Sequence, residues 1–445
     1  MCASWLGQKM KPQIDHRSGI RRCLWFRGAA SLKKPFVISS YHRSWASPTA
    51  NPDIQEKAKL AKKEEGRSTA KETAPPEMHK LILFLEVCSV YALGKKLPNP
   101  DKDCGKIIGC YAGDAWENVD SYALCSHVFY TSVQLEEDAS VTVWDPYKDT
   151  EGRGFIQCNG LRKKISHLKT LLHMHDSYDI YKNTSHTKVL TDPKLRTKLV
   201  NNIIKFVKQY GFNGIDLDLS SPPQGHASEK ENLVSLLKAL KEKFDKEKLI
   251  LTVLVDPIEE TAKILYDIKE ISALVSFINL KTYDFHGSAD DKKVGHSAPL
   301  YHSSKENAEE RKINIDSIVK YWISAGAPPN KLLLGTAFHA MISTLVNPKQ
   351  IEQGQESYGF ICKEGKDPKW KHRYDKEQKV PYLYSKNQIV TYEDKQSIKE
   401  KAEYAHNMNL GGVMVHNLGD DDFDGNCGEK MPLLKILHQI FRNKC

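Results

Sequence analysis

The larger part of this chain lacks a net charge of either sign. Residues 95–445 carry 49 Lys and Arg residues against 48 Asp and Glu residues, whereas residues 1–94 carry 16 against 8. The formal net charge of +9 therefore comes almost entirely from the N-terminal segment. Nucleic-acid-binding domains concentrate basic side chains, so we expect no nucleic-acid partner. With 445 residues, 40% of them hydrophobic and 27% charged, the chain has a globular composition and room for one large or two ordinary domains.

The chain also lacks an apolar run long enough to span a membrane comfortably. Its most apolar stretch, MHKLILFLEVCSVYALG at residues 78–94, has a basic start, an apolar centre and small residues at its end. This is the pattern of a secretory signal peptide, and it predicts a secreted, extracellular protein without a membrane span. Residues 1–77 lack a core pattern, so we expect an unstructured extension or a gene-model artefact. The alternative is an organelle-targeting peptide, because residues 1–46 hold a single acid, Asp15.

Cysteines and one glycosylation sequon agree with the secretory route. Seven cysteines follow residue 94, namely Cys104, Cys110, Cys125, Cys158, Cys362, Cys427 and Cys445. Because the number is odd, at least one is free or pairs between chains. The tripeptide NTS at Asn183 is a glycosylation acceptor.

Short apolar runs alternate with amphipathic stretches along the rest of the chain. The predicted strands are residues 106–113, 126–135, 168–175, 214–220, 249–255, 274–285, 331–340 and 411–418. Runs that are apolar on both faces and separated by helices indicate parallel strands covered by helices. Eight such units predict an α/β fold of the (β/α)8 TIM-barrel type, formed by residues 95–337 and 394–445. Residues 338–393 are too long for a loop, and we expect a small α+β insertion between strand seven and helix seven.

Polar side chains occupy the predicted carboxyl ends of several strands, where barrels of this type place their binding sites. Asp216 and Asp218 stand at i and i+2 in GFNGIDLDLSSPP, and the next position with the same orientation is Ser220. Tyr283 and Asp284 end one further strand, and His416 ends another.

These motifs resemble the glycoside hydrolases of family 18, the chitinase and chitinase-like group. GFNGIDLDLSSP matches the family motif D-G-x-D-x-D-x-E, and FINLKTYDFHG matches its M-x-Y-D segment. GAPPNKLLLGTAF and the stretch from VPYLYSKNQ to DGNCG match the family's last third. The resemblance covers about residues 106–427. It implies the barrel, with the insertion walling one side of a sugar cleft.

The resemblance also implies a chemistry in which the N-acetyl oxygen of the substrate attacks the anomeric carbon, so that no enzymic nucleophile is needed. The motif glutamate protonates the leaving oxygen, and here its position is Ser220, whose hydroxyl cannot serve as a general acid. The first aspartate of the motif is Asn213. Asp218 and Tyr283, which orient the acetamide in the family, are kept. The motif Asn213, Asp216, Asp218, Ser220 is therefore degenerate, and we expect no intact catalytic site.

Further departures concern the sugar cleft. The family's strand-eight tryptophan, which floors the central sugar site, is His416 here, and the methionine before the T-Y-D sequence is Lys281. Tyr111 and Trp116 are candidates for a partial stacking platform, with core packing as the equal alternative. The expected cleft residues are Tyr111, Trp116, Asp218, Tyr283, Asp284 and His416.

The resemblance further implies disulfides Cys110–Cys125 and Cys362–Cys427, which leaves Cys158 free. A third bridge, Cys104–Cys445, is a guess from the proximity of the chain ends.

Clustered histidines at the same end of the barrel raise a metal hypothesis. His173, His175 and His416, with Asp176 and Asp218, could supply zinc ligands. We favour polar drift in an unselected pocket, and expect no metal and no cofactor.

The resulting hypothesis is a secreted monomer that has lost catalysis and binds either a chito-oligosaccharide-like glycan or a cell-surface protein. A glycosidase of altered or residual activity is the alternative, and a folded relic without a ligand is the third.

Overall fold

The computed structural model describes residues 106–113, 116, 118–176, 187–219, 229–287, 293–347 and 350–442. Several predictions lie outside these residues. They are the extension 1–77, the signal peptide 78–94, the sequon at Asn183, the motif serine Ser220 and the cysteines Cys104 and Cys445.

Eight parallel strands form a closed barrel. They are β1 (Ile107–Ala112), β2 (His127–Leu135), β4 (Lys169–Asp176), β5 (Gly214–Asp218), β6 (Ile250–Val255), β7 (Phe277–Leu280), β8 (Leu332–Ala337) and β14 (Gly412–His416). Neighbours pair in the order β1-β14-β8-β7-β6-β5-β4-β2, and β2 pairs with β1 to close the ring. The short strand β3 (Val141–Val143) is antiparallel to β2 at the edge. The predicted (β/α)8 barrel is thus confirmed.

Most predicted strands agree with the structure within one to three residues, but two differ. The predicted strand 274–285 is only β7, because α9 ends at Leu274 and the chain leaves the sheet after Leu280. The predicted strand 331–340 is divided, since β8 ends at Ala337 and His339 already belongs to the insertion sheet. Apolar runs located these strands, but they did not reveal where the backbone turns.

Two glycines at strand starts permit close contact between neighbouring strands. A Cβ atom on Gly214 would lie 1.9 Å from the carbonyl oxygen of Ile250, and one on Gly412 would lie 1.9 Å from that of Ile107. Any side chain there would push the strands apart. Gly214 therefore fixes the packing of the very strand that carries Asp216 and Asp218.

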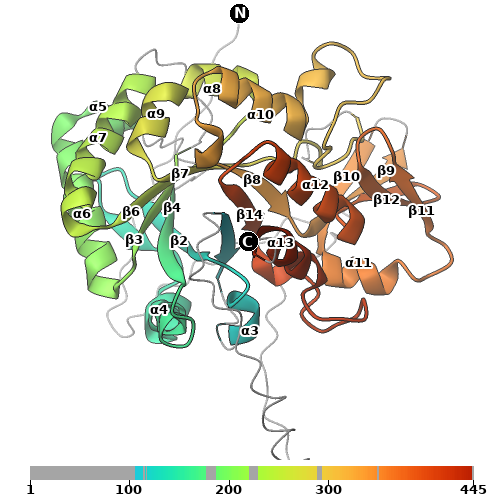
Figure 1. Cartoon of the computed structure of the whole chain (residues 1–445), viewed down its shortest axis with the longest axis horizontal. Helices are drawn as coiled ribbons and strands as arrows, with labels where there is room; N and C mark the ends of the chain where they lie inside the picture. The colour runs from blue at the N-terminus through green and yellow to red at the C-terminus, as the bar shows by residue number, and fades with distance from the viewer. Residues whose placement is uncertain are drawn as a thin grey trace, which may run out of the picture. The chain divides into compact units, whose positions relative to one another are not determined.

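Helices surround the barrel (Figure 1). They are α3 (Val119–Tyr122), α4 (Gly154–Gly160), α5 (Thr187–Thr191), α6 (Pro193–Tyr210), α7 (Glu229–Glu247), α8 (Glu259–Leu265), α9 (Ile268–Leu274), α10 (Ile315–Ser324), α12 (Lys395–Asn407) and α13 (Pro432–Arg442). Asp192 caps the start of α6, and its side chain accepts from the N–H groups of Lys194 and Leu195. The left-handed Gly211 caps the end of the helix. These caps stop α6 three residues before β5 begins.

A second sheet lies in the predicted insertion. Its strands β9 (His339–Asn347), β10 (Gln350–Ser357), β11 (Lys371–Asp375), β12 (Val380–Ser385) and β13 (Gln388–Thr391) are antiparallel in the order β10-β9-β13-β12-β11. Helix α11 (Tyr358–Glu364) follows β10. A small core of Ala340, Ile361, Leu383 and Val390 holds these elements together. In Figure 1 the insertion is drawn in orange to the right of the barrel.

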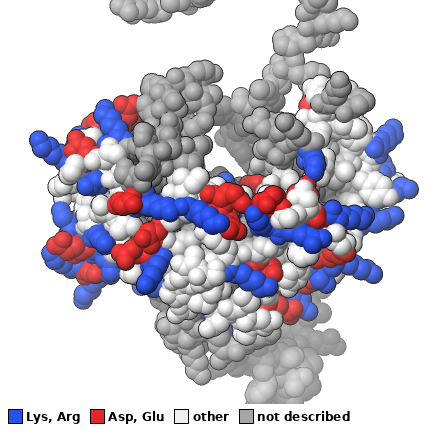
Figure 2. Space-filling model, turned by 90° about the horizontal axis from the view of Figure 1, so that it is seen from above, with Lys and Arg blue, Asp and Glu red and all other residues white. Residues whose placement is uncertain are grey.

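Two disulfides and a mixed surface complete the fold. Cys110 bonds to Cys125 and Cys362 bonds to Cys427, as the resemblance implied, while Cys158 is buried and free. Figure 2 shows Lys and Arg interspersed with Asp and Glu over the described part of one face. None of the helices within the described residues combines the length and the apolar character that a membrane crossing needs.

Candidate functional site

Asp216, the inner of the two aspartates of β5, is completely buried inside the barrel. One carboxylate oxygen of Asp216 accepts from the hydroxyl of Tyr111 at 2.6 Å and lies 2.9 Å from Nδ1 of His173. The other oxygen accepts from Thr252 at 2.6 Å and from the side-chain amide of Asn279 at 3.0 Å. Five strands of the barrel thus meet at one carboxylate. With every acceptor site used, Asp216 positions its neighbours and has no free lone pair for a ligand.

Asp218 lies one layer nearer the mouth of the barrel, at the end of β5. It pairs in register with His175 of β4 and Leu254 of β6. Side chains alternate along a strand, so Asp218 points to the same inner face as Asp216. Its side chain is only partly buried, so part of it is exposed at the barrel mouth.

An aromatic and imidazole cluster floors this mouth. The ring centroids of Tyr283 and His416 are 5.1 Å apart, and those of Tyr111 and His416 are 6.4 Å apart. Tyr283 is 2% exposed, and its hydroxyl has no hydrogen-bond partner among the described residues. Nδ1 of His416 is likewise buried and without a partner within the described part of the chain. Two buried polar groups with unused hydrogen-bonding capacity within the described chain thus lie beside one another.

Burial and neighbouring charges set the protonation of this cluster. Burial lowers the pKa of His416 to about 4, and the nearby His339 acts in the same direction. Burial strongly raises the pKa of the Tyr283 hydroxyl, as do the charges of Asp284 and Asp218. At neutral pH, both groups are therefore uncharged donors or acceptors of hydrogen bonds.

Asp284 is held by a histidine of the insertion sheet. Nε2 of His339 lies 2.7 Å from its carboxylate, and the hydroxyl of Ser297 lies 3.4 Å away. Burial would raise the pKa of Asp284, but the hydrogen bond and charge of His339 together with the nearby Lys281 and His416 outweigh burial and hold the pKa below the usual value. Asp284 has a φ of 58°, which strains a residue other than glycine. The contact between Asp284 and His339 joins the barrel mouth to β9.

The rings of Trp116 and Tyr111 are too buried to form an open stacking platform. Trp116 is 6% exposed, and its ring packs against Tyr122 and Tyr130 at 5.4 and 5.2 Å. Tyr111 is 2% exposed and stacks on Phe129 at 4.4 Å. Both rings belong to the packed interior in this structure, which agrees with the packing alternative for Trp116.

The sequence reasoning missed two residues at the mouth. Trp144, just after β3, is 62% exposed, and its ring centroid lies 5.6 Å from that of His175 on β4. An exposed indole is a ready stacking surface. A lone tryptophan in a polar segment gave no signal in the sequence, because its exposure depends on the fold.

The second missed residue is Asp256, which follows β6. Since Leu254 pairs with Asp218, Asp256 lies two residues farther toward the mouth on the neighbouring strand. Burial raises its pKa and the charge of Asp218 adds to this, although a 3.1 Å hydrogen bond from the N–H of Ile258 and the charge of Lys281 oppose the rise. A raised pKa is the direction that a general acid requires.

The metal hypothesis receives no support from the geometry of the described residues. Among the described residues, no three His, Cys, Asp or Glu side chains are grouped closely enough to hold a metal ion. His173 instead contacts Asp216, and its ring centroid is 6.4 Å from that of His175.

An eight-stranded parallel barrel with carboxylates and aromatic rings at the carboxyl ends of its strands defines the class of TIM-barrel proteins that bind ligands at that end. The chain belongs to the Glycosyl hydrolases family 18, which it matches over residues 107–421.

Relatives and solved structures agree with this assignment. Mouse chitotriosidase-1 is 30% identical over 346 residues, covering 71% of this chain and 72% of the relative. Probable chitinase 10 of Drosophila melanogaster is 27% identical over 479 residues, but the chain spans only 20% of that protein.

Among solved structures, a Group IV chitinase of Ostrinia furnacalis has a TM-score of 0.70 at 30% identity, covering 76% of this chain and 99% of the other. Human YKL-39, described as a pseudo-chitinase with retained chitooligosaccharide binding, has a TM-score of 0.67 at 26% identity, covering 75% and 99%. The chain is therefore chitinase-like in sequence and in fold.

Proposed function

We propose that this protein binds chito-oligosaccharide-like glycans at the barrel mouth without cleaving them. The observation that carries the proposal is an asymmetry between binding and catalytic groups. Tyr283 and Asp218, which the family resemblance links to the acetamide of the sugar, are present, and the Tyr283 hydroxyl has no partner within the described chain. The position of the motif proton donor is Ser220, and losing a general acid removes about 10² to 10⁴ in rate.

Several features support binding at this place. Asp218 is partly open, Asp284 is oriented by His339, and Trp144 offers an exposed ring beside the mouth. A pseudo-chitinase with a similar fold is described as keeping its chitooligosaccharide binding. Because His416 offers a smaller ring than an indole, we expect the affinity to be modest.

Calorimetric titration with a chitopentaose tests this function. The matched variant is Tyr283→Phe, which removes only the hydroxyl. A lost hydrogen bond of about 1 kcal/mol would weaken binding about fivefold. Absence of binding to the natural protein would refute the proposal, as would an unchanged affinity in Tyr283→Phe.

A second candidate function is residual hydrolysis with Asp256 as the proton donor. Its specific support is the raised pKa of a carboxyl group on the strand next to Asp218. Against this role, the hydrogen bond from Ile258 already engages one of its oxygens.

Turnover of a fluorogenic chito-oligosaccharide distinguishes the two functions. We expect none from the natural protein, and little recovery in Ser220→Glu, because Lys281 and His416 also depart from the family pattern. Turnover that disappears in Asp256→Asn but persists in the matched variant Asp267→Asn, which alters a helix cap elsewhere, would establish the residual enzyme instead.

The same proposal includes secretion, a monomeric state, and a carbohydrate or a cell-surface protein as the partner. Determining the N-terminus of the protein recovered from culture medium tests secretion. A start after residue 94 is the expected result, and retention of residues 1–77 inside the cell would contradict it.

A further inference from the structure

A second hollow lies apart from the barrel mouth. Its walls are the chain that follows β7 and the far part of the insertion sheet, namely the turn after β11 together with β12 and β13. Its volume is about 360 Å³, which lies in the range of small-molecule sites. The described residues that line it include none of Asp218, Tyr283, Asp284 and His416. We refer to it as the loop–sheet pocket.

Hydrogen bonds between its two walls hold the pocket open in a fixed shape. The N–H of Leu300 donates to the carbonyl of Gln378 at 2.9 Å, and the side-chain amide of Gln378 donates to Glu306 at 3.0 Å. Nearby, the N–H of Ser304 donates to the carboxylate of Glu377 at 2.8 Å. A pocket whose walls are fastened before binding loses little entropy when a ligand enters.

Charges of both signs line the loop–sheet pocket, and they nearly cancel. Its acids are Glu306, Glu310 and Asp375, and its lysines are Lys293 and Lys305. Lys293 pairs with Glu310 at 2.5 Å. Asp375 accepts two backbone N–H groups at 2.9 Å each. A charged ligand of either sign would meet like charges, whereas an uncharged ligand can use these fixed donors and acceptors.

The pocket also presents three rings, those of His286, His296 and Tyr382. Nδ1 of His296 is buried and lacks a partner among the described residues, and its ring centroid lies 5.5 Å from that of Tyr382. Tyr382 is only partly buried. His286 belongs to the same wall as His296. Its ring lies so close to Gly295 that a Cβ atom added to this glycine would be 2.2 Å from the ring. An aromatic face beside fixed polar groups suits a molecule that has both C–H faces and hydroxyl groups.

We propose that the loop–sheet pocket binds a compact, uncharged, polyhydroxylated molecule of monosaccharide to disaccharide size. The ring of Tyr382 lies against the C–H face of the ligand. Nδ1 of His296 and the carboxylates of Glu306 and Asp375 exchange hydrogen bonds with its hydroxyl groups. This site is independent of the function proposed for the barrel mouth.

Saturation-transfer NMR on the full chain tests the site with named probes. The neutral probes are glucose, N-acetylglucosamine and myo-inositol, and the matched charged probes are glucosamine and glucuronate. We expect at least one neutral probe to bind, with both charged probes at least about fivefold weaker, as a penalty of about 1 kcal/mol implies. Equal or tighter binding of a charged probe would overturn the assignment of ligand class.

Variants locate the binding. Tyr382→Ala should weaken the neutral probe about fivefold or more, since it removes a contact of about 1 kcal/mol, while Tyr382→Phe keeps the ring and most of the affinity. Tyr147→Ala, an exposed tyrosine that does not line the pocket, is the matched control and should change the affinity less than twofold. If Tyr382→Ala does not fold, as judged by its melting temperature, His296→Phe replaces it with the same expectation. The site is refuted if no neutral probe binds the natural protein, or if Tyr382→Ala weakens binding no more than Tyr147→Ala does.

Discussion

The hydroxyl of Tyr111 on β1 donates a 2.6 Å hydrogen bond to the carboxylate of Asp216 on β5, across the interior of the barrel. Both residues are buried, with exposed fractions of 2% and 0%. The amide of Asn279 contacts both at 3.0 Å. In this chain, the inner motif aspartate thus serves the architecture of the barrel whether or not the protein catalyses a reaction.

The first prediction concerns Asp216. Asp216→Ala leaves the buried donors of Tyr111, Thr252 and Asn279 without their acceptor, and each such group costs about 1–3 kcal/mol. We expect a loss of at least about 3 kcal/mol in the free energy of unfolding, measured by urea denaturation. Tyr111→Phe removes one donor to Asp216 and one acceptor for Asn279, and should cost about 1–2 kcal/mol. A loss below about 1 kcal/mol in Asp216→Ala would show that water replaces the network.

The second prediction concerns acid stability. The pKa of His416 is about 4 in the folded protein because of burial, His339, Lys281 and His173, although Asp284 opposes the shift. The unfolded chain, with a histidine pKa near 6.5, binds more protons between these values, so stability falls as the pH drops from about 6.5 to 4.

His416→Gln removes this share of the acid sensitivity. Relative to the natural protein at each pH, the variant should gain on the order of 2 kcal/mol between pH 7 and pH 4. Denaturation series at several pH values measure the difference. Parallel curves for the two proteins would show that His416 titrates normally.

The third prediction concerns Trp144. Trp144→Ala should weaken binding of chitopentaose about threefold to tenfold, since a stacking contact is worth about 0.5–1.5 kcal/mol. Tyr147 is 77% exposed on the same segment, so Tyr147→Ala is a matched control that should leave the affinity nearly unchanged. Equal effects of both substitutions would assign the role to the whole segment instead of the indole.

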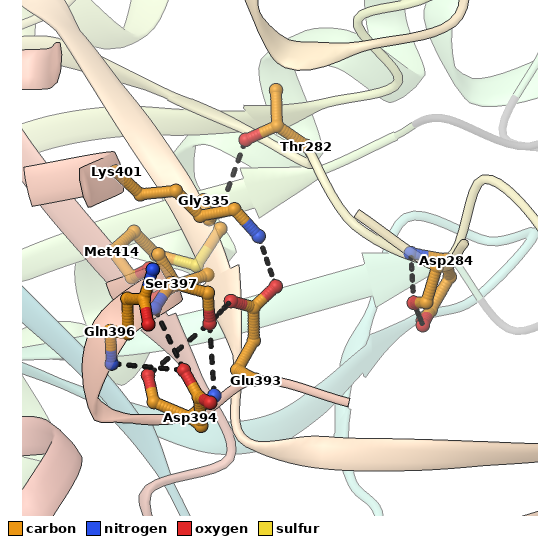
Figure 3. A network of polar contacts seen from close by, with 11 residues as sticks. Thr282, Asp284, Gly335, Glu393, Asp394, Gln396, Ser397, Lys401 and Met414 are labelled. Atoms are coloured by element: carbon orange, nitrogen blue, oxygen red, sulfur yellow. Dashed lines mark hydrogen bonds and ion pairs between the residues drawn. The ribbon is translucent and has the colours of Figure 1, made fainter. Parts of the chain in front are cut away.

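The fourth prediction concerns a buried ion pair between the end of the insertion and α12. Lys401 of α12 is 1% exposed and pairs with Glu393, which also accepts from Ser397 at 2.6 Å (Figure 3). Lys401→Met leaves a buried carboxylate alone and should cost about 3–5 kcal/mol at pH 7. The double variant Lys401→Met, Glu393→Gln should recover most of this loss.

The pH dependence of Lys401→Met provides the check. Burial already raises the pKa of Glu393, and removing the lysine raises it further, so the folded variant prefers the protonated acid. Its stability loss should therefore shrink as the pH falls from 7 toward 4.5. A loss independent of pH would mean that packing, and not charge, accounts for the effect.

Local patterns were sufficient for the barrel but not for its interior contacts. Apolar runs and the glycine before Asp216 located β5, and motif order located Tyr283, Asp284 and His416 at strand ends. The bond of Asp216 to Tyr111 crosses the barrel from β5 to β1, and its bond to Thr252 joins neighbouring strands that lie far apart in the sequence, so no local sequence pattern predicted them. The burial of Trp116 could not be predicted either, because it depends on how Tyr122 and Tyr130 pack around the ring in the folded chain.

The contacts that complete the barrel mouth were equally impossible to predict from the sequence. His339 reaches Asp284 only because the chain bends at Phe338, between β8 and β9. Asp256 resembles an ordinary residue before a helix, and only its register beside Asp218 gives it interest. Ser220, on which the proposed loss of catalysis depends, lies outside the residues that the structure describes.

Because β1 hydrogen-bonds to β14, the ring cannot close on the ribosome until synthesis has passed His416, more than three hundred residues after Ile107. Until then β1 and β8 each present an unsatisfied edge to the surroundings. A chain that ends before β14 would therefore keep two open sheet edges, which favour pairing with other chains and aggregation.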